Sequence, residues 1–232
     1  MHEPSEPTVV EDTRERLLRI GLERARSQGL RALTVRGVAR EANVNLGSFV
    51  HHFGTRDAFV GEVIEAWYRP FYGRLEFVAD IARPPFDRLR TLVAQVVEFL
   101  VENRAFIVHV IADAAAGEPG AREFVRSMAR RHPALLIASA AQAIAAGHLP
   151  PSSPLKVVVF LMMSAGGPVL WLTGLGQGGI VPREFQRELD ALAADRDAAL
   201  ERLDWALAGL ATTAERSSAR HGPAGGAEIH GG

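Results

Sequence analysis

Cysteine is absent from this chain of 232 residues, and lysine occurs only once, at Lys156. Without cysteine the protein can form neither disulfides nor thiolate metal sites, which fits a reducing cytoplasm. The motifs GxSxG and HExxH are also missing, and the glycine-rich run at 174–179 follows an apolar helical segment rather than a strand. These absences argue against the common classes of hydrolase, metalloprotease and dinucleotide-binding enzyme. We therefore expect neither an enzyme nor a cofactor.

Long alternating strand patterns are missing as well, and apolar residues recur at helical spacing along the chain. Apolar residues make up 47% of the sequence, which is enough for a sizeable core, so we predict an all-α fold. The acidic N-terminus MHEPSEPTVVEDT has no apolar centre, and no signal peptide is expected. We predict a disordered arm at 1–12, a helix-turn-helix domain at 13–55, a larger helical domain at 56–211 and a disordered tail at 212–232.

Three short helices are predicted between residues 13 and 53. Gly29 can stop the first helix, and Thr34 and Asn45 can cap the second and third. Asn43 lies at the corner between the second and third helices, where asparagine tolerates a positive φ angle. Two helices joined by so short a turn are typical of a helix-turn-helix motif.

Positive charge is concentrated in the same segment. Between residues 13 and 56 there are nine basic and three acidic side chains, although the whole chain has a formal net charge of −1. Such a concentration is typical of a nucleic-acid-binding domain, and a merely solvated basic face is the alternative.

The stretch 157–181 has no charged residue and resembles a membrane span in composition. Gly166, Gly167 and Pro168 interrupt it, and no basic cluster flanks it as the positive-inside rule would require. We favour an apolar helix inside a soluble assembly. The alternative is a membrane-associated helical regulator anchored through 157–173.

The segment TVRGVAREANVNLGSFVHHFGTRDAF, residues 34–59, resembles the DNA-binding signature of the tetracycline-repressor (TetR) family. The positions that carry the resemblance are Gly29, Thr34, Ala39, Val44, Gly47, Ser48, His52, Phe53, Thr55 and Arg56. Three positions depart from the family pattern, because Val50 replaces a usual tyrosine, Ala25 a usual phenylalanine and Phe49 a usual leucine or isoleucine. The operator preference therefore stays open.

The resemblance implies a ligand-responsive transcriptional regulator in the cytoplasm, with an N-terminal helix-turn-helix domain and a larger helical ligand-binding and dimerisation domain. Such a protein is expected to bind palindromic double-stranded operator DNA as a homodimer and to be released by a small, mostly apolar effector. Repression is our first expectation, and activation is the alternative.

The predicted DNA contacts combine residue chemistry with the resemblance. Arg36 is the candidate base reader, because arginine can contact O6 and N7 of guanine together, and a phosphate contact is its alternative. Adjacent helical residues point about 100° apart, so His51 and His52 cannot readily chelate one ion. The resemblance implies that both histidines donate to phosphate, with local packing of His52 as the alternative. The predicted set is Thr34, Arg36, Asn45, Leu46, Gly47, Ser48, Val50, His51, His52 and Arg56.

Thr34, Ser48 and Arg56 resemble phosphate anchors of the family. Val50 can contact a thymine methyl group, and Gly47 permits close approach of the backbone.

The resemblance also implies an effector pocket formed by the helices after residue 56. Aromatic and methionine side chains are candidates to line it, and ordinary core packing is the alternative for each. The candidates are Phe71, Phe99, Phe106, His109, Phe124, Phe160, Met163 and Trp171. His109 and Asp113 have helical i, i+4 spacing and His132 is a third candidate, so a metal or acidic-ligand site there stays open. We expect no metal elsewhere.

The helices expected at 154–174 and 183–210 have more apolar surface than one subunit can bury. This predicts a dimer interface, and completion of a monomer core is the alternative. The candidates are Leu161, Val169, Leu189, Leu192, Leu203 and Leu207.

Overall fold

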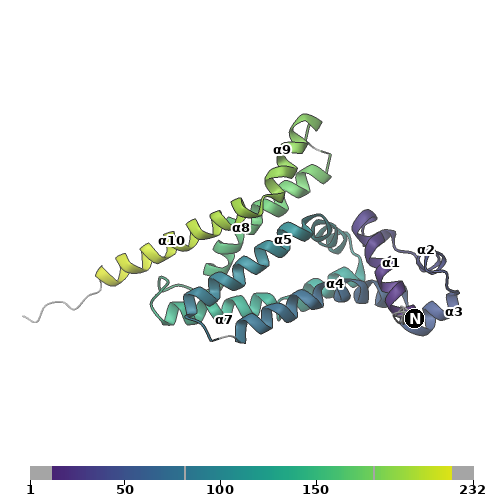
Figure 1. Cartoon of the computed structure of the whole chain (residues 1–232), viewed down its shortest axis with the longest axis horizontal. Coiled ribbons are helices and arrows are strands. Elements are labelled where there is room, and N and C mark those ends of the chain that lie inside the picture. Colours follow the sequence, from purple (N-terminus) through teal and green to yellow (C-terminus); the bar gives the residue numbers. More distant parts are fainter. Residues whose placement is uncertain (1–11, 81, 180, 221–232) are drawn as a thin grey trace, which may run out of the picture. The chain divides into compact units, whose positions relative to one another are not determined.

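The computed structural model describes residues 12–80, 82–179 and 181–220, and every regular element in these ranges is a helix (Figure 1). The predicted all-α fold is confirmed. Almost all of the arm predicted at 1–12, and residues 221–232 of the predicted tail, lie outside the described residues.

The three short N-terminal helices form as predicted. They are α1 (Thr13–Gln28), α2 (Val35–Glu41) and α3 (Leu46–Phe53), and a 3-10 turn that the sequence did not reveal, η1 (Leu30–Ala32), precedes α2. The side chain of Thr34 accepts the N–H of Gly37 at 3.1 Å, so it caps α2. Asn43 has a φ angle of 53°, which confirms its place at the corner between α2 and α3.

A small aromatic core holds these helices to the beginning of α4 (Arg56–Asp80). The ring of Phe59 lies 5.0 Å from Phe49 and 4.8 Å from Phe53, centroid to centroid, with edge contacts in both pairs. Gly21 on α1 is required here, because a Cβ atom at this position would lie 2.5 Å from the Phe59 ring. The buried side of α3 is therefore held against α4.

The next two helices are α5 (Pro85–Ala115) and α6 (Pro119–Met128). Helix α5 is continuous over its whole length. No proline or glycine interrupts α5, and the side chains of Asn103 and Arg104 bond to the carbonyls of Phe99 and Val101 within the helix. One compact unit comprises the residues up to 73 together with 105–129.

The second compact unit comprises 74–104 and the residues from 130 onwards. Its further helices are α7 (His132–Ala145), α8 (Pro154–Gln177), α9 (Arg183–Ala194) and α10 (Arg196–Arg220), and α8 packs against the other three. The single stripe expected at 183–210 is divided at Asp195, whose side chain accepts the N–H of Ala198 at 2.9 Å and starts α10.

Helix α10 continues past residue 211, where the sequence predicted the helical domain to end. The hydroxyl groups of Thr212 and Thr213 bond to the carbonyls of Ala208 and Gly209, which lets these β-branched residues remain within the helix.

Helix α8 is long and apolar enough to cross a membrane by length and composition, and 33% of its most apolar window is buried in the structure. It contacts α7, α9 and α10 within the second unit. These contacts fit the interpretation of α8 as a central packing helix with one exposed side.

Candidate nucleic-acid interface

Helix α3 is amphipathic and presents a mixed surface to solvent. Phe49 and Phe53 are buried, whereas the side chains of Leu46 and Val50 are 45% and 55% exposed. Asn45 caps the helix by accepting the N–H of Ser48 at 2.8 Å. Only the Oδ1 atom of Asn45 is used in this cap, so its amide N–H groups remain available as donors.

Gly47 and His51 are exposed on the same short helix, and Ser48 is half-buried. Exposed apolar groups beside hydrogen-bond donors are what contact with a thymine methyl and a neighbouring base edge requires.

Helix α2 contributes basic side chains to the interface. Arg36 is exposed near the beginning of the helix, and Arg40 is exposed near its end. Thr34 is exposed at the cap and uses its oxygen as an acceptor, which leaves its hydroxyl hydrogen for a phosphate. The predicted contacts on α2 are therefore accessible in the structure.

The two histidines at the end of α3 differ in their surroundings. His51 is exposed, whereas His52 is half-buried, and the centroids of their rings lie 5.3 Å apart at an interplanar angle of 68°. His52 also lies 6.1 Å from the ring of Phe53, so both of its proposed roles, packing and phosphate contact, are compatible with its position. Within the described residues, no group of three or more histidine, cysteine, aspartate or glutamate side chains is arranged to hold a metal.

Arg56 occupies a different environment from the other predicted DNA contacts. Its Nε donates to the carbonyl of Leu33 at 2.7 Å, and one terminal nitrogen donates to the carbonyl of Leu30 at 2.9 Å. Both terminal nitrogens reach the carboxylate of Glu118, at 2.9 and 3.0 Å. The hydrogen bond with Glu118 raises the pKa of Arg56, in spite of its partial burial.

The guanidinium of Arg56 is thus engaged with η1 and with the beginning of α6, and is turned away from the role of phosphate anchor that the sequence predicted. Sequence reasoning missed Glu118, which is only 6% exposed. Its position directly before Pro119, at the N-cap of α6, was the one available signal.

A second acid holds the same turn from the other side. The carboxylate of Asp113 accepts the N–H of Leu30 at 2.7 Å, so Leu30 is bonded at both its N–H and its carbonyl. Gly29 has a φ angle of 81°, and a Cβ atom there would lie 3.1 Å from Asp113 and 3.7 Å from Nδ1 of His109. Asp113 and His109 therefore meet the N-terminal domain, which corrects the idea of a metal site built on their helical spacing.

His132 lies at the beginning of α7 in the second unit. Burial lowers the pKa of His132 to about 4, so it is neutral near pH 7.

The residues proposed to line an effector pocket divide into two groups. Phe71, Phe99, Phe106 and Phe124 are buried and His109 is half-buried, whereas Phe160, Met163 and Trp171 are 47%, 64% and 66% exposed on α8. The rings of Phe71, Phe106 and Phe124 pack on other aromatic rings, as in the pair of Phe124 with Tyr68 at 5.2 Å. The three exposed side chains cannot line an enclosed pocket within one subunit.

The residues proposed for a dimer interface also fall into a buried and a more exposed group. Leu161, Val169, Leu203 and Leu207 are at most 2% exposed, because they lie on the faces with which α8 and α10 pack within the subunit. This corrects their assignment as interface contacts. Leu192 is 53% exposed and Leu189 is half-buried on α9. The outer apolar surface is formed instead by Leu155, Val159, Phe160, Met163 and Trp171 of α8 and by Trp205 of α10.

Comparison with known proteins gives a consistent result. Residues 17–63 match the family described as "Bacterial regulatory proteins, tetR family". A curated relative, the HTH-type transcriptional repressor KstR2 of Mycolicibacterium smegmatis, is 30% identical over 105 residues, which cover 45% of this chain and 51% of the relative. The chain thus spans about half the length of the curated relatives it matches.

Two solved structures share the fold over most of the chain. The ketosteroid transcriptional regulator KstR2 of Mycobacterium tuberculosis is 22% identical with a TM-score of 0.60, covering 87% of this chain and 96% of that one. A regulator from Rhodococcus sp. is 19% identical with a TM-score of 0.61, covering 86% and 99%.

Proposed function

Because this chain belongs to the TetR family of bacterial regulatory proteins, we propose that it is a cytoplasmic transcriptional repressor that binds a palindromic operator as a homodimer. The observation that carries the proposal is the exposed surface of α2 and α3. This surface combines Arg36, which can read guanine, with Leu46 and Val50, which can contact thymine methyl groups. Thr34, Ser48, His51 and His52 supply donors for phosphate.

Arg56 has an indirect role in this proposal. It holds η1 and α6 through Leu30, Leu33 and Glu118, and so it fixes the segment from which α2 begins. We expect Arg56→Ala to reduce DNA binding by loosening this segment, because its guanidinium is already fully hydrogen-bonded.

A dimer is proposed because a single α3, acting as the helix that reads the bases, contacts too few base pairs to select a genomic site. A two-fold dimer would place two such helices about 34–36 Å apart, which is one turn of DNA. The exposed apolar surface of α8 and α10 supports this assembly, since surfaces of this kind mark protein contacts. Release by a small, mostly apolar effector would require that it favour the non-binding conformation by several kcal/mol, about 5.5 for a complete switch.

Genome-wide mapping of bound DNA, followed by anisotropy titrations on the operator and on a scrambled duplex, tests the proposal. Arg36→Ala should weaken operator binding by about 1–3 kcal/mol per half-site and have far less effect on the scrambled duplex. The matched control is Arg69→Ala, because Arg69 is an exposed arginine outside α2 and α3. No preference for any genomic site, or equal losses on both duplexes, would contradict the assigned role of α2. A reporter gene placed behind the operator separates repression from activation.

Light scattering tests the assembly independently. Met163→Glu or Trp205→Glu should convert a dimer into monomers, because both side chains are 64% exposed on the proposed interface. Phe77→Glu is the control, since Phe77 is 70% exposed on α4. A monomeric wild-type protein at micromolar concentration would rule out the dimer.

A further inference from the structure

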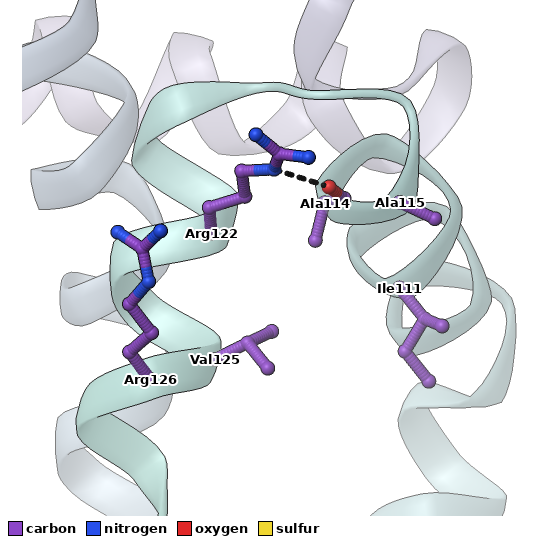
Figure 2. Close-up of a pocket in the computed structure, with 6 residues that line it drawn as sticks. All are labelled: Ile111, Ala114, Ala115, Arg122, Val125 and Arg126. Carbon is purple, nitrogen blue, oxygen red and sulfur yellow. Dashed lines mark hydrogen bonds between the residues drawn. The ribbon is translucent and has the colours of Figure 1, made fainter.

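An open groove lies between the C-terminal end of α5 and helix α6, with a volume of about 490 Å³. One wall consists of Ile111, Ala114 and Ala115 from α5, and the other of Arg122, Val125 and Arg126 from α6 (Figure 2). The volume lies within the range of about 300–1,000 Å³ that is usual for small-molecule sites.

The groove combines an apolar surface with positive charge at its edge. Ile111 and Val125 project from opposite walls and are 51% and 39% exposed, although both are large apolar side chains (Figure 2). Exposed apolar residues that face one another across a groove favour an apolar occupant, because its binding removes both from water.

Arg122 is held in place at one end of this apolar surface. Its Nε donates to the carbonyl of Ala114 across the groove at 3.1 Å, as Figure 2 shows. Among the described residues, no carboxylate lies within ion-pair distance of Arg122, whereas Arg126 has an exposed and therefore weak pair with Glu123 at 3.4 Å. The two terminal nitrogens of Arg122 therefore remain available as a fork of donors, which matches the two oxygens of a carboxylate.

We propose that this groove binds an amphipathic carboxylate, with its hydrocarbon chain between Ile111 and Val125 and its carboxylate on Arg122. A neutral hydrocarbon would gain no charge-assisted hydrogen bond from the guanidinium, and a small anion would leave the apolar walls in water. Both parts are therefore needed for binding.

The position of the groove connects it to the proposed function. Asp113 lies in the last turn of α5, directly before Ala114, and Glu118 directly precedes α6. These two acids hold η1 through Leu30 and Arg56. An occupant that moves α5 and α6 relative to one another therefore acts on the segment that leads into α2. This regulatory consequence rests on the proposed function, whereas binding in the groove does not.

Isothermal titration calorimetry of the full chain tests the site with octanoate, 1-octanol and inorganic phosphate as probes. Octanoate should bind with one site per chain, and the two other probes should bind at least tenfold more weakly. Arg122→Ala should weaken octanoate binding about tenfold, the size expected for a lost charge-assisted hydrogen bond. Arg122→Lys should lie between the two, because it keeps the charge and loses the fork.

Two further variants separate the groove from general effects of charge. Val125→Asp should remove octanoate binding by placing a like charge in the apolar wall, and Arg69→Ala should leave it unchanged, because Arg69 lies on α4 outside the groove. No binding of octanoate, equal binding of octanol, or unchanged binding by both Arg122→Ala and Val125→Asp would overturn the site.

Anisotropy on the operator with and without octanoate tests the regulatory consequence. Saturating octanoate should weaken operator binding of the wild-type protein and leave that of Arg122→Ala unchanged. Octanoate binding without an effect on DNA would overturn the coupling alone. Failure to bind any operator in the absence of octanoate would instead contradict the proposed function and leave the calorimetric result intact.

Discussion

Helices α3 and α10 are both amphipathic, but their charged and polar groups are used differently. On the outer side of α3, Asn45 and His51 are exposed next to the apolar Leu46 and Val50. On α10, the carboxylate of Asp204 is paired with Arg90 of α5 at 2.8 and 2.9 Å. At the beginning of α10, Arg196 pairs with Glu98 of α5 at 2.5 Å.

The difference indicates what each surface can bind. Exposed donors on α3 suit a polar, charged partner such as DNA. On α10, Arg196 and Asp204 already have partners in the same subunit, and the side chain of Trp205 is 64% exposed. An exposed tryptophan of this kind suits a protein partner. Changes on α3 should thus alter binding without altering stability, and changes on the inner side of α10 should do the reverse.

The largest expected effect comes from the inner side of α10. Leu203 is 1% exposed, so Leu203→Ala should lower the free energy of unfolding by about 2–5 kcal/mol through lost burial and a cavity. Val50→Ala on α3 is the control and should change stability by about 0.5 kcal/mol or less. Chemical denaturation of both variants measures the contrast. Similar losses in the two would mean that α3 is packed more tightly than its exposure indicates.

Glu118 tests how firmly the turn that precedes α2 is held, because it pairs with Arg56, which bonds to Leu30 and Leu33. Glu118→Ala would leave the guanidinium of Arg56 partly buried without its main partner. We expect a loss of about 2–4 kcal/mol in unfolding free energy, less than for a fully buried pair because the Arg56 side chain is 28% exposed. Asp57→Ala removes a 3.2 Å contact to the same arginine at an exposed site, and it should cost about 1 kcal/mol or less. Equal effects of the two would show that burial of Glu118 is unimportant.

These contacts mark the limit of what the sequence could predict. The caps of α2 and α3 lie within three residues of their partners, so Thr34 and Asn45 could be identified from local chemistry. The bond from Leu30 to Asp113 joins residues 83 positions apart, and nothing local signals it. Arg56 was misjudged for the same reason, since its partner Glu118 is distant in sequence.

The orientation of the C-terminal helices was also beyond the sequence. Helical periodicity correctly placed Leu203 and Leu207 on one face, but it does not say whether that face meets the same subunit or another. Trp205 lies between them in sequence and on the outer side of the helix, where its exposure depends on the packing of α8 and α10. Nothing in the local pattern marks that packing.

In the second unit, the free energy of unfolding should depend on pH through His132 on α7. Burial lowers its pKa from 6.5 to about 4, so the unfolded chain binds more protons between these values. The stability contributed by neutral His132 is present above pH 6.5 and is lost as the pH falls towards 4. The loss between pH 7 and pH 5 should be about 2 kcal/mol. Denaturation of wild type and His132→Gln at both pH values measures it, and an identical pH dependence in the two would show that other groups are responsible.

The smallest effect is expected for the pair that ties α10 to α5. Arg90 and Asp204 are 49% and 48% exposed, so their two hydrogen bonds compete with water and are screened by salt. The hydrogen bond with Asp204 raises the pKa of Arg90, but a bidentate pair this exposed should contribute only about 0.2–1 kcal/mol to folding.

A double-mutant cycle of Arg90→Ala and Asp204→Ala at low and at high salt isolates that coupling from the effects of each truncation. Because the pair is bidentate, its coupling should lie in the upper half of the range at low salt and fall when the charges are screened. A coupling near zero at low salt would mean that Asp204 is not effectively held by α5. Its carboxylate would then be free to accept a donor from a partner, and the outer side of α10 would resemble that of α3 in carrying uncommitted polar groups.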